Sequence, residues 1–241
     1  MGKRRSEVHR TSKRSHFTDN LQPGDIITGE DILGVDRRET DALPPPGWLR
    51  GEASPFTMDV FDCRAVALTS VATTADPAIA NTFSRLRQSD GREYIDTFPE
   101  DARTLEIHLQ FELGGATLKD GPLFKAEQME DKWDIYLYGN LMYFVRSWTG
   151  MLVHVALCRE IEGVLSIEHL ATAYEQIDQR DRTFFVREIF FLIVSHVLGN
   201  VYPHPVPSYR AGDDASILQF SFSEFGRRGW YATVPDAAPA Q

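Results

Sequence analysis

The sequence contains little cysteine and no recognisable catalytic motif. Its 241 residues include 2 cysteines, Cys63 and Cys158, which are far apart and form no CxxC pair. Neither a disulfide framework nor a zinc ribbon is indicated, so we expect buried, inert thiols in a cytoplasmic protein. HExxH, GxSxG, P-loop and GxGxxG motifs are missing as well. The pattern therefore predicts no metal and no cofactor, and it marks no residue as catalytic.

Long apolar runs are also missing. The most apolar stretch, Phe184–Leu198, is shorter than a membrane span and is interrupted by Arg187, Glu188 and His196. We interpret it as a buried helix over about 182–198, capped by Asp181 and ended by Gly199-Asn200. Within it His196 is expected to be a core histidine, with a base or switch as the alternative. We expect no membrane partner.

Basic residues are scarce over most of the chain, which has a net charge of -10. A nucleic-acid surface needs clustered Lys and Arg, so nucleic acid is an expected partner only for the basic segment 1–16. That segment has six basic residues against Glu7: Lys3, Arg4, Arg5, Arg10, Lys13 and Arg14. Charge runs of this kind are typical of disordered, solvated tails.

Composition divides the rest of the chain into three parts. Residues 17–55 are rich in Pro and Gly and predict an extended arm, 56–234 predict a single α+β domain, and 235–241 predict a loose tail. Asp59 and Asp62 near the start of the domain could be an acid/base pair, but a spacing of three places them on opposite faces of a strand. We expect them to have surface or capping roles.

Turn residues and hydrophobic periodicity predict the helices and strands on either side of residues 130–158. They indicate one or two strands in 57–74, a helix from Asp76-Pro77 to about Gln88, and a strand over 105–111 that ends at Gly114-Gly115. Ser166 is expected to cap a helix to about Gln176. The run Ser216–Phe222 predicts a last strand.

The stretch Glu130–Gly150 is unusually rich in aromatic and cationic side chains. Gly139-Asn140 separates two strand-like runs, Trp133–Tyr138 and Leu141–Trp148. A two-residue connection with glycine in first place is typical of a tight β-hairpin.

Thr149-Gly150 offers a second two-residue turn before the apolar run Met151–Cys158. The sequence therefore predicts an antiparallel meander over 133–158, packed against the buried helix. Cross-strand pairing then sets three pairs opposite each other: Tyr138 and Leu141, Tyr136 and Tyr143, and Trp133 and Arg146.

The two faces of this meander differ in chemistry. One is expected to be core with a cation at its rim: Trp133, Ile135, Leu137, Met142, Phe144 and Arg146. The other carries Tyr136, Tyr138 and Tyr143, whose rings can bury area while their hydroxyls keep hydrogen bonds. Arg146 over Trp133 would form a cation–π pair worth about 0.5–2 kcal/mol.

The same stretch supplies the candidate ligand-binding residues: Lys132, Trp133, Tyr136, Tyr143, Arg146, Ser147, Trp148 and Thr149. Arginine binds phosphate through two parallel hydrogen bonds, indoles stack on bases, and hydroxyls add neutral donors. The alternative is structural, because Trp and Arg in a meander can also lock the sheet to the buried helix.

The segment Met129–Gly150, MEDKWDIYLYGNLMYFVRSWTG, resembles an uncharacterised bacterial domain with an EDKW…LYF-x-RSWTG-type motif. It departs from the commoner form at Gly139-Asn140 and Val145. That domain sometimes occurs beside macrodomains or ADP-ribosylglycohydrolases. The resemblance implies an ADP-ribose-related context and transfers no activity.

Two functional classes remain open. The first is an accessory module, non-catalytic, that binds a small anionic or nucleotide-like ligand, or a partner protein. The second is a hydrolase that acts on an ADP-ribose-like or nucleotide substrate. A pocket of His or carboxylate groups beside Arg146 would favour the enzyme, and a flat aromatic face would favour the module.

The basic segment is expected to be dispensable for folding, because Val8 is its only large apolar residue besides Met1. Deletion of residues 1–16 should leave the melting temperature within about 1 °C, the effect expected when no buried surface is lost. Differential scanning calorimetry of the full-length and shortened chains measures this directly. A fall of many degrees would contradict the expectation.

Overall fold

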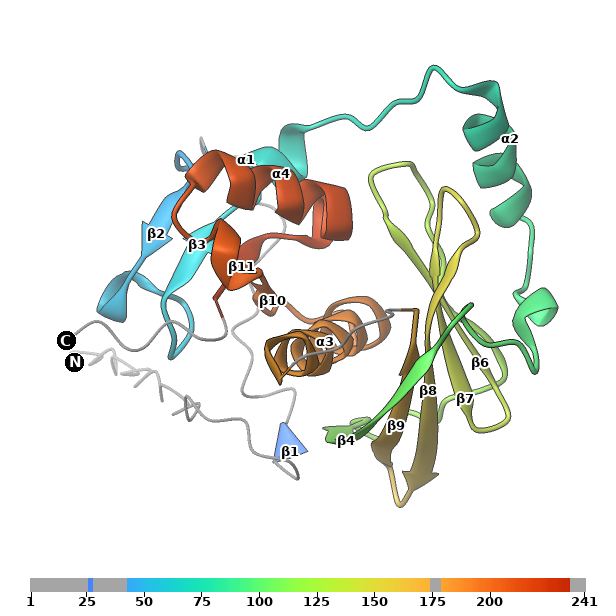
Figure 1. The fold of residues 1–241 in the computed structure, drawn as a ribbon. Coiled ribbons are helices and arrows are strands. Elements are labelled where there is room, and N and C mark those ends of the chain that lie inside the picture. The colour runs from blue at the N-terminus through green and yellow to red at the C-terminus, as the bar shows by residue number, and fades with distance from the viewer. Residues whose placement is uncertain (1–25, 28–42, 174–178, 235–241) are drawn as a thin grey trace, which may run out of the picture.

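The computed structural model describes residues 26–27, 43–173 and 179–234 of the chain. The predicted α+β class is confirmed: two sheets lie on either side of helix α3 (Figure 1). The strand orders are β1-β4-β9-β8-β7-β6-β5 and β10-β11-β3-β2. The predicted basic tail 1–16, the loose tail 235–241 and most of the predicted arm 17–55 lie outside the described residues.

The larger sheet is an antiparallel meander of five strands, β5 to β9, with β4 added beside β9. Its strands are β4 (Arg103–Glu112), β5 (Gly121–Phe124), β6 (Trp133–Tyr138), β7 (Leu141–Arg146), β8 (Leu152–Ile161) and β9 (Val164–Thr172). The short β1 (Ile26–Ile27) pairs in parallel with the outer edge of β4. The strand predicted to end at Gly114-Gly115 is thus confirmed as β4.

The β6–β7 hairpin forms as the turn chemistry predicts. Tyr136 pairs with Tyr143, Trp133 with Arg146 and Tyr138 with Leu141. Gly139 has a φ of +61°, a value that suits the first position of a type II′ turn and that other residues adopt only with strain. Loop length and a single glycine therefore set the register of the pair.

The predicted two-residue turn at Thr149-Gly150 is wrong. Five residues, Ser147 to Met151, connect β7 to β8, and the Arg146 amide donates to the Met151 carbonyl at 2.9 Å. The chain turns earlier than the strand pattern suggests, because β7 ends at Arg146 and the Gly150 amide donates back to the Arg146 carbonyl at 2.8 Å.

Helix α3 (Gln179–Leu192) packs on the larger sheet and continues into a π-helical turn, η4 (Ile193–Val197). The predicted buried helix is confirmed, and Gly199 ends it with a φ of +72°. Asp181 is not its cap, because the helix already begins at Gln179. Gln and Arg, the two residues before Asp181, are both good helix formers. His196 is a core histidine, as expected, and burial holds its pKa well below the usual value.

The helix predicted for 166–176 is wrong, because Ser166 lies in strand β9. This strand pairs with β4 on one side and with β8 on the other. Its buried residues Leu165 and Ile167 alternate with less buried ones, and two neighbouring strands satisfy its backbone. Pairing over long distances in sequence outweighs the local signal for a helix cap.

The smaller sheet was not predicted. It consists of β2 (Gly47–Leu49), β3 (Val60–Asp62), β10 (His204–Pro205) and β11 (Tyr231–Thr233). Strands of two or three residues carry almost no periodic signal, and these come from both ends of the described chain. Helix α4 (Asp214–Phe225) covers this sheet, and its Ile217 packs with Phe61 and Val206.

The structure changes two local predictions near the smaller sheet. One strand in 57–74 is confirmed, as β3. The second strand allowed for in 57–74 is helix α1 (Arg64–Thr69), whose first amide, that of Arg64, is capped by Asp62 Oδ1 at 3.0 Å. The last strand predicted at Ser216–Phe222 is α4, which Asp213 caps by accepting from the Ala215 amide. Its buried residues Ile217, Ser221 and Phe225 recur every four residues and so share one helix face.

Helix α2 (Pro77–Leu86) begins as predicted, with Asp76 accepting from the Ala78 amide at 2.8 Å. It lies beside the larger sheet (Figure 1). The short helices are η2 (Gly51–Ala53), η3 (Arg92–Tyr94), η5 (Ser208–Arg210) and η6 (Gly226–Arg228). No helix in the described part of the chain is long and apolar enough to cross a membrane.

Substitution of Gly91 should destabilise the fold more than substitution of another left-handed glycine. Gly91 has a φ of +87°, and a Cβ there would lie 2.2 Å from the Tyr136 ring. We expect Gly91→Ala to cost about 1–2 kcal/mol for backbone strain and about 1–3 kcal/mol more for overpacking. Urea denaturation measures the loss.

Gly114→Ala is the matched control, because Gly114 has a φ of +58° and no atom lies within 4 Å of the added Cβ. This variant should lose only the stability that backbone strain costs, about 1–2 kcal/mol. Equal destabilisation by the two variants would refute the close packing of Gly91 on Tyr136.

Candidate functional site

The rim of the β6–β7 hairpin binds the C-terminal end of helix α4. The Trp133 indole Nε1 donates to the Glu224 carbonyl at 2.7 Å, and Arg146 Nη1 donates to the same oxygen at 3.1 Å. Arg146 also donates to the Glu224 carboxylate at 3.1 Å and to the Ser223 carbonyl at 2.9 Å. We call these four residues, Trp133, Arg146, Ser223 and Glu224, the α4 clamp.

The clamp satisfies groups that a helix leaves unpaired. The last carbonyls of a helix lack intrahelical donors, and the partial negative charge at this end favours a cation. The Arg146 guanidinium also lies 4.8 Å from the centre of the Trp133 ring, so the predicted cation–π pair is confirmed. Arg146 is therefore held by hydrogen bonds, by an ion pair and by an aromatic face.

Three further candidate residues fasten the hairpin to the segment before β6. Ser147 Oγ donates to the Asp131 carbonyl at 2.6 Å, and Trp148 Nε1 donates to the Met129 carbonyl at 2.7 Å. Lys132 Nζ donates to the same Met129 oxygen at 2.9 Å. These contacts place Lys132, Ser147 and Trp148 beside the clamp.

The Lys132 amine lies against two aromatic rings, 4.1 Å from the centre of the Trp148 ring and 5.1 Å from that of Phe222. Desolvation and the nearby charge of Arg146 lower the pKa of Lys132 to about 8. Thr149, in contrast, is exposed and its hydroxyl accepts only from the Met151 amide.

Tyr136 and Tyr143 lie on the opposite face of the hairpin, away from the cations, and both are buried. The Tyr136 hydroxyl accepts from Lys125 Nζ at 2.6 Å, and its ring stacks on Tyr94. Burial raises the pKa of Tyr136 above its usual value. The phenol face is thus covered by residues around Tyr94, and the structure separates these two phenols from Lys132 and Arg146.

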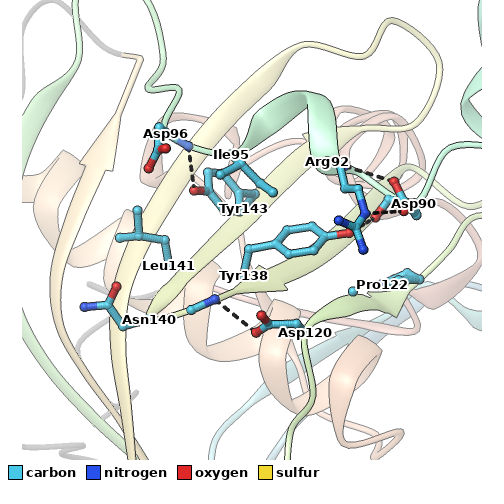
Figure 2. Close-up of a pocket in the computed structure, with 12 residues that line it drawn as sticks. Asp90, Arg92, Ile95, Asp96, Asp120, Pro122, Tyr138, Asn140, Leu141 and Tyr143 are labelled. Carbon is cyan, nitrogen blue, oxygen red and sulfur yellow. Dashed lines mark hydrogen bonds and ion pairs between the residues drawn. The ribbon is translucent and has the colours of Figure 1, made fainter.

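An open pocket of about 570 Å³ lies at the turn of the same hairpin (Figure 2). It is lined by parts of three segments, 90–96, 120–122 and 138–143. Tyr143 is the only residue of the predicted site among those that line it. The Tyr138 side chain crosses the middle of the pocket, with Asp120 below it in the view and Arg92 above.

The pocket carries more carboxylates than cations. Asp90, Asp96 and Asp120 line it, and Arg92 is the single basic residue of the described lining. Arg92 is held by Asp90 through Nε at 2.8 Å, and these hydrogen bonds lower the pKa of Asp90. Asp120 accepts from the Gly139 amide at 3.0 Å through one oxygen, which leaves the other available.

Sequence reasoning missed these carboxylates because each is an ordinary turn residue. Asp120 satisfies the hairpin amide of Gly139, and Asp90 receives the amide of Arg92 as turn aspartates often do. The Asp-Gly pair at 90–91 and Gly139-Asn140 were the available signals, since both mark turns. Their meeting in space depends on the strand order β7-β6-β5.

The two cysteines and the carboxylates Asp59 and Asp62 lie outside the clamp and the pocket. Cys63 and Cys158 are buried, as expected, and burial raises the pKa of Cys63 to about 12 and that of Cys158 to about 11. Asp62 forms an ion pair with Arg64 at 2.7 Å, and Asp59 accepts from the Gly51 amide at 3.0 Å. Across the described ranges, no group of three or more His, Cys, Asp or Glu residues could hold a metal ion.

Arg146→Lys should lower the free energy of unfolding by about 2–3 kcal/mol, because lysine keeps the charge but loses the fork of donors to Ser223 and Glu224. Chemical denaturation measures this loss. Arg159→Lys is the control, since Arg159 is exposed and lies 4.0 Å from Glu168. An unchanged stability of the Arg146 variant would show that the clamp contributes nothing.

Neither a family model, nor a curated protein, nor a solved structure matches this chain. The contacts of the α4 clamp and the lining of the hairpin pocket are therefore the basis on which a function can be proposed.

Proposed function

We propose that the protein is a non-catalytic binding module whose hairpin pocket holds a ribose-bearing, nucleotide-like ligand. The observation that carries the proposal is the open pocket in which Asp90 and Asp120 lie near the Tyr138 ring and Asp96 lies beside Tyr143. Carboxylates accept hydrogen bonds from the paired hydroxyls of a ribose, as acidic residues do in dinucleotide-binding folds. The aromatic ring and the apolar Ile95 and Leu141 give a base or sugar face a surface to cover.

Phosphate would lie at one end of the pocket. The Arg92 guanidinium is 73% exposed and is 5.9 Å from the centre of the Tyr138 ring, so its outer donors face solvent. Asp90 offsets part of its charge, and Asp96 and Asp120 repel a second phosphate. The ligand class is therefore a nucleoside or a nucleotide with its charge held near Arg92, which includes ADP-ribose-like molecules.

A hydrolase acting on such a ligand fits less well. A general acid must keep its proton near neutral pH, and the hydrogen bonds from Arg92 lower the pKa of Asp90, opposite to that need. The buried pair His154–Glu188, at 3.3 Å, is fully covered by protein and lies outside the pocket lining.

An anion held at Lys132 and Arg146 is the second candidate, and Lys132 favours it. Its Nζ has one hydrogen bond, to Met129, and its pKa is lowered to about 8, as expected for a desolvated cation without a close carboxylate. A phosphate group there would restore the missing charge partner. The Trp148 ring would form a wall of this site, whereas Ser147 is buried and its hydroxyl donates to the Asp131 carbonyl.

Isothermal titration with adenosine, 2′,3′-dideoxyadenosine, AMP and ADP-ribose tests the ribose proposal. Adenosine should bind about tenfold more tightly than the dideoxy compound, the effect of one or two lost hydrogen bonds. Asp96→Asn should weaken adenosine binding about fivefold to tenfold, because the amide accepts less strongly than the carboxylate.

Asp101→Asn is the matched control. Asp96 and Asp101 are both exposed and have positive φ values, 59° and 52°, but Asp101 does not line the pocket. It should leave binding unchanged. Equal affinity for the two nucleosides, or no binding of either, would defeat the ribose proposal, and AMP binding that is lost in Arg146→Lys but kept in Asp96→Asn would support the second candidate.

A further inference from the structure

Two phenols of the hairpin hold the segment that forms one wall of the pocket, residues 90–96. The Tyr138 hydroxyl donates to the Asp90 carbonyl at 2.7 Å, and the Tyr143 hydroxyl accepts from the Asp96 amide at 3.2 Å (Figure 2). Both hydroxyls therefore bond to the backbone of carboxylate residues that line the pocket.

The backbone of Asp96 has an unusual conformation. Its φ is +59°, in the left-handed region that residues other than glycine adopt with strain, although aspartate does so more readily than most. The amides of Ile95 and Thr97, on either side, donate to carbonyls within the same segment at 3.2 Å and 3.0 Å. The Asp96 amide donates instead to Tyr143, which lies on β7 and is 47 residues away in the sequence.

Tyr143 offers the Asp96 amide a fixed acceptor. Its side chain is 1% exposed, and its strand pairs with β6 on one side and with β8 on the other. A rotation of Asp96 out of the left-handed region would break this hydrogen bond. Because the backbone sets the direction of Cβ, the same contact limits where the Asp96 carboxylate can lie.

We propose that Tyr143 is a positioning residue, whose hydroxyl orients the Asp96 carboxylate toward the ribose diol and so sets the preference of the pocket for ribose over a deoxy sugar. The inference rests on the proposed ribose-bearing ligand. A carboxylate that is already oriented loses less conformational freedom when it binds two hydroxyls than one that must first be ordered. Asp96 is exposed, so its order has to come from its backbone.

Tyr143→Phe tests the proposal, because it keeps the buried ring and removes only the hydroxyl. Isothermal titration with adenosine and 2′,3′-dideoxyadenosine gives the ratio of the two affinities for each variant. The ratio of about ten expected for the wild type should fall to about two in Tyr143→Phe, a change of the size that one weakened hydrogen bond produces. A purely structural defect would weaken the binding of both nucleosides alike and leave the ratio unchanged.

Tyr94→Phe is the matched control. The Tyr94 hydroxyl donates to the Gly150 carbonyl at 3.1 Å, so this variant also loses a hydrogen bond between residues 90–96 and the larger sheet's connections. Tyr94 lies outside the lining of the pocket, and its hydroxyl does not bond to Asp96. The ratio of affinities should therefore stay near the wild-type value.

Amide hydrogen exchange, followed by NMR, reports on the contact without a ligand. Exchange at the Asp96 amide should become about tenfold faster in Tyr143→Phe, the effect of one lost hydrogen bond, and exchange at the Thr97 amide should not change. Unchanged exchange at Asp96 would overturn the inference.

The titrations separate this inference from the proposed function. If the wild type prefers adenosine and Tyr143→Phe keeps the same ratio, the inference alone is wrong. If the wild type binds neither nucleoside, the proposed function is wrong and the inference falls with it.

Discussion

The larger sheet is joined to helix α4, which covers the smaller sheet, through the C-terminal carbonyls of that helix. A helix end buried without donors is costly, and here the donors come from the larger sheet: the indole of Trp133 and the fork of Arg146. A second link runs alongside, because the Arg227 amide donates to the Glu130 carbonyl at 3.0 Å. A Cβ on Gly226 would lie 1.7 Å from that carbonyl oxygen, so only glycine allows this approach. The aromatic and basic residues of 130–150 are concentrated where one half of the fold must satisfy the backbone of the other.

The larger sheet is consequently buried on both faces around the hairpin. On one side α3 and the clamp cover Trp133, Ile135 and Phe144, and on the other Tyr94 stacks on Tyr136. Little of β6 and β7 is then left for a ligand except the turn, where Tyr138 and Leu141 are half-buried. The pocket forms at the turn because the end of the hairpin extends past the residues that pack on its two faces.

Local chemistry accounts for the parts of the fold that the sequence predicts correctly. Gly139-Asn140 sets the register of β6 and β7, and Asp76-Pro77 sets the start of α2, because both signals act within a few residues. Distant pairing accounts for the errors. The alternating pattern of Ser216–Phe222 is typical of a strand, but the segment is a helix that Asp213 caps. Its Ile217 and Phe225 pack against residues far away in the chain. The short strands of the smaller sheet acquire their partners only on folding.

The candidate site was predicted in part for the same reason. Residue type alone identifies Trp133, Arg146 and Lys132 as unusual, but it does not distinguish a cation that awaits an anion from one that caps a helix, since both need the same donors. The structure separates these two roles among neighbours. Arg146 has Ser223 and Glu224 as acceptors, whereas Lys132, one strand away, has one carbonyl and two rings. Arg146, whose donors are taken up by α4, is therefore the less available of the two cations for a ligand. Lys132 is the cation of this cluster that keeps unused donors.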